Sequence, residues 1–444
     1  MTVRFVGDDP VLDCDRFQLR SGLDVVVHPD PAVPLVHVSV WYRVGSSDEE
    51  AGESGFAHLY EHMFKNSLHL GGRHHYDVLR RGGATSANAS TSSDRTAYHE
   101  TVPAHQLDLA LWLESDRMGY FLPAFDEARL AAQKAVVRSE RRQRYENAPY
   151  GADRFAIAEA LWPEGHPHRY LTIGRHVDIE AATMERVTRF YRTWYVPANA
   201  VLVVAGDVDA ADARARVEHW FGSFPSSLRP RRPAPAPPAL GGVHRAAVED
   251  RFAALARIHR AWHAPAVGAA GEAELDLLAA ILAQPGTGSL WRRLVYDRHL
   301  AQRVQVWQQS TRIGGEWHVT VDLRSGADPA AVRAILDDEL ARVATDGVDA
   351  RALARAQTRR EAAVLWRLDG LERRAALIQR AMLYRERPDA LAEEMARWRA
   401  VTVSSVRDAV QAWLRPGAMV EIETIPLRRA PVVGPEAPIT DDVA

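Results

Sequence analysis

Residues His58 to His62 read His-Leu-Tyr-Glu-His, and this run constrains the fold more than any other feature of the 444-residue sequence. On an α-helix, residues four apart project from one face, so both imidazoles can reach a single metal ion. Glu61 lies between them, close enough to polarise a water molecule at that metal. Two histidines with this carboxylate form the inverted order of the commoner zinc-peptidase motif. The run therefore requires a rigid helix and indicates hydrolytic zinc chemistry.

The residues before the motif fit such a helix. Gly52 to Gly55 supply turn residues, with Ser54 as a candidate N-cap, and the sequence predicts a helix over Phe56 to Phe64. Upstream, Leu35 to Val44 alternates in polarity and is rich in β-branched residues, which predicts a strand. A helix entered from a strand through a short turn is a rigid place to hold metal ligands.

A zinc hydrolase needs a third protein ligand, which leaves the fourth position for water. The candidate is Glu140, near the end of a helix that the apolar spacing predicts over Asp126 to Tyr145. On spacing alone, Glu140 reads as an ordinary surface carboxylate paired with Arg144 at i+4, and that interpretation is favoured until other features are considered.

Further motifs follow in order along the chain: GFAHLYEHMFK at 55–65, GGATSANAST at 82–91, AVVRSE at 135–140 with NAPY at 147–150, and FYRTWYVPANAVLVVAGD at 190–207. This series resembles the pitrilysin/insulinase family of zinc peptidases, in the bacterial branch that is similar to the mitochondrial processing peptidase. The resemblance covers nearly the whole chain, and although a single motif is only moderately specific, the ordered series is highly specific. By its position in that series, Glu140 inherits the role of third ligand to one zinc ion per chain.

The resemblance implies roles for further residues. Glu61 would be the general base that activates water and later passes the proton to the leaving amine. The stretch Ser86 to Thr91 would be an exposed edge strand that captures an extended peptide, with Asn88 and Ala89 contacting the peptide backbone. Without the resemblance, this stretch reads as a plain polar strand. Many active relatives carry a glutamate where this chain has Gln133, which can hydrogen-bond but cannot ionise, so tuning of the metal's surroundings would be weaker.

Length and composition predict two or more domains of ordinary globular character. The net charge of −3 gives no reason to expect binding to nucleic acid or to an anionic membrane. The one cysteine, Cys14, excludes an internal disulfide and does not resemble a nucleophile site. The sequence shows neither a signal-peptide pattern nor a stretch long enough to span a membrane, so a cytoplasmic location is expected.

The chain divides near residue 226, where a proline-rich stretch predicts a semi-rigid linker. We expect an N-terminal zinc-binding domain at 1–225, the linker at 226–245 and a C-terminal domain at 246–444 that repeats the first without its metal site. The last residues, 428–444, are expected to be loosely ordered. The family's architecture implies an α+β fold with two homologous domains, each a mostly antiparallel sheet with helices packed on it, arranged as half of a clam shell.

The second half contains an informative difference from the family. The segment 284–302 resembles a glycine loop and helix in which self-sufficient members carry an arginine and, seven residues later, a tyrosine that bind the substrate carbonyl. Here these positions are Val295 and Gln302. We therefore expect a heterodimer in which a homologous partner supplies the Arg/Tyr pair and peptides or unfolded segments are the substrates. The alternatives are a self-sufficient homodimeric oligopeptidase and a scaffold subunit that has lost catalysis.

The other histidines are interpreted as residues that do not bind metal. His74 and His75 are expected on a surface loop and His166 and His168 in a loop, while His99 and His105 lack a partner at ligand spacing.

Overall fold

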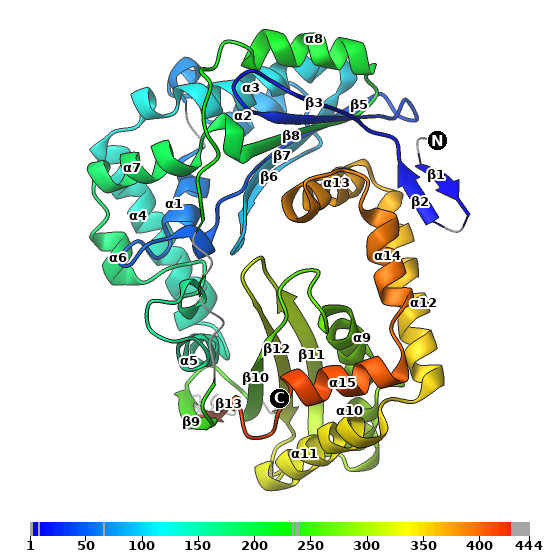
Figure 1. Ribbon diagram of the computed structural model, residues 1–444. Coiled ribbons are helices and arrows are strands. Elements are labelled where there is room, and N and C mark those ends of the chain that lie inside the picture. The colour runs from blue at the N-terminus through cyan, green and yellow to red at the C-terminus, as the bar shows by residue number, and fades with distance from the viewer. Residues whose placement is uncertain (1–2, 8, 65–66, 233–234, 236–239, 428–444) are drawn as a thin grey trace, which may run out of the picture.

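The computed structural model describes residues 3–7, 9–64, 67–232, 235 and 240–427. The chain forms two α+β domains, each built on a β-sheet, and the first sheet lies above the second in Figure 1. Part of the predicted linker (233–234 and 236–239), Lys65 of the motif series and the tail 428–444 lie outside the described residues.

The first domain follows a small hairpin of β1 (Val3–Val6) and β2 (Asp9–Leu12). Val36, Val38 and Val40 alternate along β5 and are fully buried in the core, which explains why this segment forms a strand. The sheet order is β3 (Asp15–Gln18), β4 (Asp24–Pro29), β8 (Ala200–Gly206), β5 (Leu35–Tyr42), β7 (Thr96–Pro103) and β6 (Ser86–Thr91). The helices are α1 (Phe56–Met63), α2 (His75–Arg81), α3 (Leu107–Tyr120), α4 (Glu127–Arg141), α5 (Gly151–Leu161), α6 (His176–Glu180), α7 (Met184–Trp194) and α8 (Ala210–Phe221).

The second domain has its own core between one face of its sheet and its helices. The sheet order is β9 (Val243–Asp250), β13 (Met419–Pro426), β10 (Arg257–Ala264), β12 (Gly315–Leu323) and β11 (Ala301–Ser310). The helices are α9 (Glu272–Ala283), α10 (Ser289–Trp291) with a π-helical turn (Arg292–Asp297), α11 (Pro329–Asp346), α12 (Ala350–Leu368), α13 (Leu371–Arg385), α14 (Leu391–Arg399) and α15 (Val403–Trp413).

The two sheets repeat one topology. The order β4-β8-β5-β7-β6 corresponds to β9-β13-β10-β12-β11, and in each sheet the first pair is parallel while the others are antiparallel. Helices α1 and α9 occupy the same place in this order, between the central strand and the hairpin that ends the sheet. The predicted duplication of an α+β domain is therefore confirmed.

Each domain packs one of its helices on the sheet of the other. Helix α13 of the second domain packs on β5 and β8 of the first sheet, and α5 of the first domain packs on β10 and β13 of the second. Each contact forms an apolar cluster shared by both domains. Gln379 of α13 also donates to the backbone carbonyl oxygens of Ser39 and Val201, at 2.9 and 3.1 Å. The pairing covers part of the second face of each sheet and fixes the relative position of the domains.

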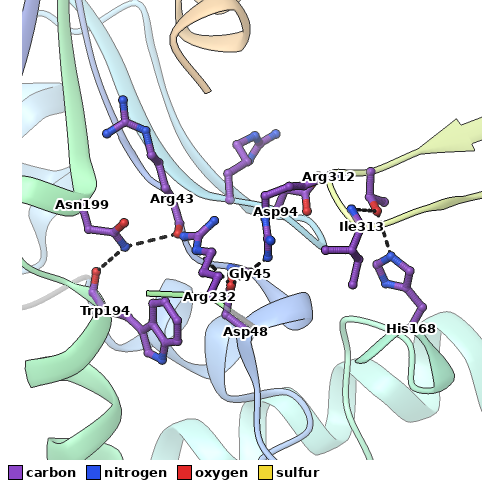
Figure 2. A network of polar contacts seen from close by, with 12 residues as sticks. Arg43, Gly45, Asp48, Asp94, His168, Trp194, Asn199, Arg232, Arg312 and Ile313 are labelled. Carbon is purple, nitrogen blue, oxygen red and sulfur yellow. Dashed lines mark hydrogen bonds and ion pairs between the residues drawn. The ribbon is translucent and has the colours of Figure 1, made fainter. Parts of the chain in front are cut away.

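The hairpin turns at the ends of the two sheets meet at the centre of the molecule. The backbone amide of Arg312, in the β11–β12 turn, donates to Asp94 of the β6–β7 turn at 2.8 Å. The guanidinium groups of Arg312 and Arg232 both form ion pairs with the carboxylate of Asp48, at 3.3 and 3.1 Å (Figure 2). His168 meets Thr311 of the same turn at 2.8 Å. Arg232, in the predicted linker, thus joins the contact between the two hairpin turns.

The local predictions are confirmed with adjustments at the ends of elements. The strand expected over Leu35 to Val44 is β5, and the long helix expected over Asp126 to Tyr145 is α4 followed by a π-helical turn at Arg142–Glu146. Within the described residues, every helix is too short or too polar to cross a lipid bilayer.

Candidate metal centre

Helix α1 begins at a backbone position that only glycine adopts readily. Gly55, its N-cap, has φ of 91°, and a Cβ there would lie 2.8 Å from the Cδ1 of Ile179. The carboxylate of Glu49 accepts hydrogen bonds from the amides of Gly55 and Ala57, both at 2.9 Å. The expectation that Ser54 caps the helix is wrong, because its hydroxyl is directed to Asp178 instead. A longer side chain from six residues upstream satisfies the helix N-terminus.

The predicted ligands converge on one point. His58 and His62 lie one turn apart on α1, and their Nε2 atoms are 3.7 and 3.1 Å from Oε2 of Glu140 on α4. Donor atoms at tetrahedral positions about 2.1 Å from a zinc ion are roughly 3.4 Å apart, so the two distances bracket the expected value. Two imidazoles and one carboxylate are also the donor set of known catalytic zinc sites. The three side chains therefore fit a zinc ion.

Glu140 combines both interpretations that the sequence suggested. Its Oε1 pairs with Arg144 one turn further along, at 2.7 Å, while Oε2 is directed to the two imidazoles. Arg144 is largely exposed, but the Glu140 side chain is only 14% exposed. The surface ion pair is real, and it leaves one carboxylate oxygen aimed at the histidines.

Glu61 lies beside the ligand set and is held by a second element. Its ligand atom is within 4.8 Å of those of His58 and His62. Oε2 of Glu61 accepts a hydrogen bond from the hydroxyl of Thr91, the last residue of β6, at 2.7 Å. The contact of Thr91 with Glu61 was not predicted, because the sequence does not indicate which face of the strand meets α1.

Strand β6 has the bounds predicted for the edge strand, and it lies at the end of the first sheet within the described part of the chain. The amide of Ser92 donates to the carbonyl of Arg95 at 2.9 Å, and hydrogen-bonded pairs alternate along an antiparallel ladder. The backbone groups of Ala89 and Thr91 therefore point away from β7. The Ala89 amide accordingly bonds the exposed Asn88 side chain, whose Oδ1 lies 2.9 Å away.

The remaining predicted positions lie away from the ligands. Gln133 is half-buried two turns before Glu140 on α4, and its side chain forms no hydrogen bond with the other described residues. Val295 packs against the core of the second domain from the π-helical turn after α10, and Gln302 is exposed on β11. Both residues belong to the second domain, and Figure 1 places α10, which precedes them in the chain, well apart from α1 of the first domain.

A second group of histidine and carboxylates is buried behind the sheet. His75, Glu100 and Glu114 lie close enough together to suggest a metal site, but the guanidinium of Arg117 is 2.6 Å from His75 and 2.9 Å from Glu114. Burial raises the pKa of Glu100 and lowers that of His75. A cation already occupies the middle of the group, so it is a salt-bridge network.

The expectation of a surface loop for His75 is wrong, because it is a buried residue of α2, while His74 is that helix's N-cap. His166 and His168 do lie in a short turn, as expected, but both are buried. His99 lies 3.6 Å from Glu372 of α13. These histidines join segments of the chain together.

Two family models match the chain. One, described as insulinase (peptidase family M16), matches residues 24–160, which include His58, Glu61, His62 and Glu140. The other, described as the peptidase M16 inactive domain, matches residues 181–360, which contain none of these four. The two matches together extend over both domains.

The chain is also similar to individual proteins and to solved structures. Zinc protease PqqE of Helicobacter pylori is 30% identical over 289 residues, covering 64% of this chain and 64% of that protein, so the chain spans less than two-thirds of its relative's length. A solved protease from Helicobacter pylori has a TM-score of 0.85 at 23% identity, covering 94% of this chain and 100% of that one. A Pseudomonas fluorescens structure described as a peptidase M16 inactive domain has a TM-score of 0.81 at 17% identity, covering 94% and 98%. At these identities, the solved structures establish the shared fold alone.

Proposed function

Because the chain belongs to the insulinase family of peptidases, family M16, we propose that it is a zinc-dependent endopeptidase that cleaves peptides or unfolded segments. One observation carries the proposal: His58, His62 and Glu140 converge, with Glu61 beside them and the edge of a sheet next to Glu61. Similar relatives are named zinc proteases, which supports the choice of metal and of reaction.

His58, His62 and Glu140 would hold the zinc ion, and each has a distinct support. Helix α1 fixes the two imidazoles, and Arg144 restrains the carboxylate of Glu140 through its other oxygen. Zinc, when bound, would supply Lewis acidity that polarises a peptide carbonyl and makes water a better nucleophile. The protein's part is to keep these three donors at fixed separations.

Glu61 would act as the general base. Its carboxylate would take a proton from the attacking water and deliver it to the leaving amine, as hydrolysis of an amide requires. The Thr91 hydroxyl donates to one carboxylate oxygen at 2.7 Å, which helps to hold the carboxylate in one orientation. Thr91 would therefore position Glu61 while itself belonging to the peptide-binding strand.

The peptide would bind as an additional strand beside β6. The outward backbone groups of Ala89 and Thr91 can pair with an extended chain, and the Asn88 side chain that now bonds the Ala89 amide would move aside. Thr91 is the last residue of β6 and also contacts Glu61. A peptide bound along this edge would therefore run close to the general base. This geometry favours extended segments over folded proteins, whose backbone groups are already paired.

A homologous partner would complete the active site. Neither Val295, which has an apolar side chain, nor Gln302 carries a positive charge to stabilise an oxyanion. Both also belong to the second domain, whereas α1 belongs to the first, so we infer that a donor for the developing charge would come from another subunit. A second copy of this chain would again present Val295 and Gln302. We therefore favour a heterodimer over the self-sufficient homodimer, and the intact ligand set disfavours a scaffold subunit.

The test is metal content together with peptide hydrolysis, for the chain alone and mixed with a homologue that carries the Arg/Tyr pair. We expect one zinc per chain, little activity alone and strong activity in the mixture. The Glu61→Gln variant should keep zinc and lose nearly all hydrolysis, because the ligands remain while the base is gone. Full activity of the chain alone would overturn the heterodimer, and absence of zinc would favour a scaffold.

A further inference from the structure

A groove of about 770 Å³ lies between the first sheet and the helices α12 and α13. Apolar and aromatic side chains form much of its wall, including Trp41 of β5 and Trp366 of α12. Trp366 is 71% exposed, so a large apolar surface is left uncovered in the described part of the molecule. Four arginines also line it: Arg95, Arg367, Arg373 and Arg380.

The charge of the groove is unbalanced. Its described lining contains four arginines and no aspartate or glutamate, although the chain as a whole has a net charge of −3. Arg380 lies 3.7 Å from Glu394, but Arg95, Arg367 and Arg373 form no ion pair with any carboxylate among the described residues. Arg95 stacks on the Trp41 ring at 4.4 Å, and burial lowers its pKa. The groove therefore favours an anionic group.

Helix α13, which forms one wall, runs along the peptide-binding strand. Near its start, Glu372 meets Ser86, the first residue of β6, at 3.4 Å. Near its end, Tyr384 donates to Asp94, just past the last residue of β6, at 2.8 Å. From Glu372 to Tyr384 the helix rises about 18 Å. Strand β6 covers about 17 Å. The helix and the strand are thus matched in length and aligned at both ends.

The side chains of β6 alternate between two environments. Thr91 faces α1, where it meets Glu61, whereas Ser86 faces α13. Ser90 lies on the same face as Ser86 and contacts Arg95 of the groove at 2.8 Å. A strand added beside β6 has the same alternation, so every second side chain of a bound peptide would point to the α13 side.

We propose that this groove selects peptides with acidic side chains at alternate positions. The peptide would bind along β6, and every second side chain would place a carboxylate near Arg367 and Arg373 and its stem against Trp366. The inference rests on the proposed peptidase function and adds the chemical class of its substrate. The intervening side chains of the peptide would point towards α1, so a carboxylate there would not raise the affinity through these arginines.

The experiment is a glutamate scan measured by binding. A neutral peptide is synthesised with Glu, and in parallel with Gln, at each successive position. Fluorescence anisotropy then gives the affinity of each for the full-length zinc-loaded Glu61→Gln variant, which does not cut them. We expect Glu to improve Kd about tenfold over Gln at every second position and not at the positions between. The improvement should shrink as salt is added.

Two further variants test the assignment to the groove. The double variant Arg367→Gln, Arg373→Gln should bring the Glu-to-Gln ratio to about one. Arg359→Gln should retain the ratio, because Arg359 is an arginine of the same helix α12 that faces a separate pocket beside α9. Arg373→Glu should reverse the preference towards peptides with lysine at those positions.

The outcomes separate this inference from the proposed function. Equal affinities throughout the scan, undetectable binding of every Glu peptide, or a ratio unaffected by the double variant would overturn the acidic specificity. Hydrolysis of the neutral peptide by the wild-type chain and its partner tests the peptidase function independently. Cleavage without an alternating preference would remove the specificity alone, and an alternating preference without cleavage would remove the peptidase function alone.

Discussion

Helices α1 and α9 occupy equivalent places in the two domains and begin in the same way. Each follows an N-cap glycine in the left-handed region, with φ of 91° at Gly55 and 90° at Gly271. Counted from these glycines, the second residue is alanine and the fourth is leucine in both helices, and these residues are buried. The positions of His58, Glu61 and His62 are taken in α9 by Glu274, Leu277 and Leu278.

The difference extends to the neighbouring helices. Where α4 brings Glu140 to 3.1 Å from His62, α12 brings Arg360 to 2.8 Å from Asp276 of α9. The same frame of sheet, glycine and helix pair therefore holds the proposed metal ligands in one domain and leucines with an ion pair in the other. The fold does not depend on the metal site, and the chemistry comes from a few side chains placed on it.

The sharpest way to break this comparison is to give α1 the residue that α9 has. His62→Leu copies Leu278 and removes one of three proposed ligands. We expect zinc affinity to fall by more than about 100-fold, since even residues that only orient a ligand contribute 10- to 100-fold. Zinc content after gel filtration, together with competition by a chelator, measures the loss.

The matched control is Glu274→Gln, which changes the residue of α9 equivalent to His58. It should leave zinc content at one per chain, because no metal ligand is touched. Retention of a full zinc equivalent by His62→Leu would contradict the ligand set.

The reverse exchange tests whether α9 tolerates a metal ligand. Leu278 is fully buried in the second core, so Leu278→His removes apolar contacts and buries a polar ring. We expect a loss of about 2–5 kcal/mol in the stability of the second domain, seen as a lower melting temperature in calorimetry. Glu274→His, at a half-buried position of the same helix, should cost much less. Equal melting temperatures for the two variants would mean that α9 is not packed as described.

The sequence was sufficient for the features that depend on short spacings and insufficient for those that depend on contacts between distant segments. The helix predicted over Phe56 to Phe64 follows from the turn residues just before it, and Ser86–Thr91 reads as a strand even without the family resemblance. Glu140 needed the family resemblance, because its spacing alone also describes a surface ion pair with Arg144, which it does form.

The features that were missed or wrongly predicted also depend on contacts between distant segments. The cap from Glu49, the burial of His75 against Arg117 and the bond from Thr91 to Glu61 each join residues whose approach no local pattern encodes. The exchange of α5 and α13 between the sheets is a further example, since it depends on the whole topology.

Asp48, which pairs with Arg312 of the β11–β12 turn, gives the stability of the protein a predicted dependence on pH. Burial raises the pKa of Asp48 from 3.8 to about 6, against the attraction of Arg232 and Arg312 and the Gly45 amide, and with repulsion from Asp94. A pKa raised in the folded state means that the folded protein holds the proton more tightly. The stabilisation is therefore complete below pH 3.8 and is lost as the pH rises through about 6. Its size is roughly 3 kcal/mol.

The measurement compares wild type with Asp48→Asn, which cannot titrate, by chemical unfolding at intervals from pH 4 to pH 7. The stability of wild type relative to the variant should fall by roughly 2 kcal/mol across this range, because part of the stabilisation is already lost at pH 4. Taking the difference at each pH removes contributions from zinc and from other groups that both proteins share. A constant difference, or one that grows with pH, would contradict the burial of Asp48 as the dominant cause.

The smallest expected effect concerns the hydrogen bond from Tyr384 of α13 to Asp94 of the β6–β7 turn. Burial raises the pKa of Tyr384, so its hydroxyl stays protonated and donates to the buried carboxylate of Asp94 at 2.8 Å. Tyr384→Phe should destabilise the protein by about 1–2 kcal/mol, because Asp94 loses one of its donors while the amide of Arg312 remains. Tyr296→Phe, at a site that is 66% exposed, should change stability by less than about 0.5 kcal/mol. If both variants melt at the wild-type temperature, the link between α13 and the β6–β7 turn is not a stabilising contact, and the alignment of α13 with β6 would rest on Glu372 and Ser86 alone.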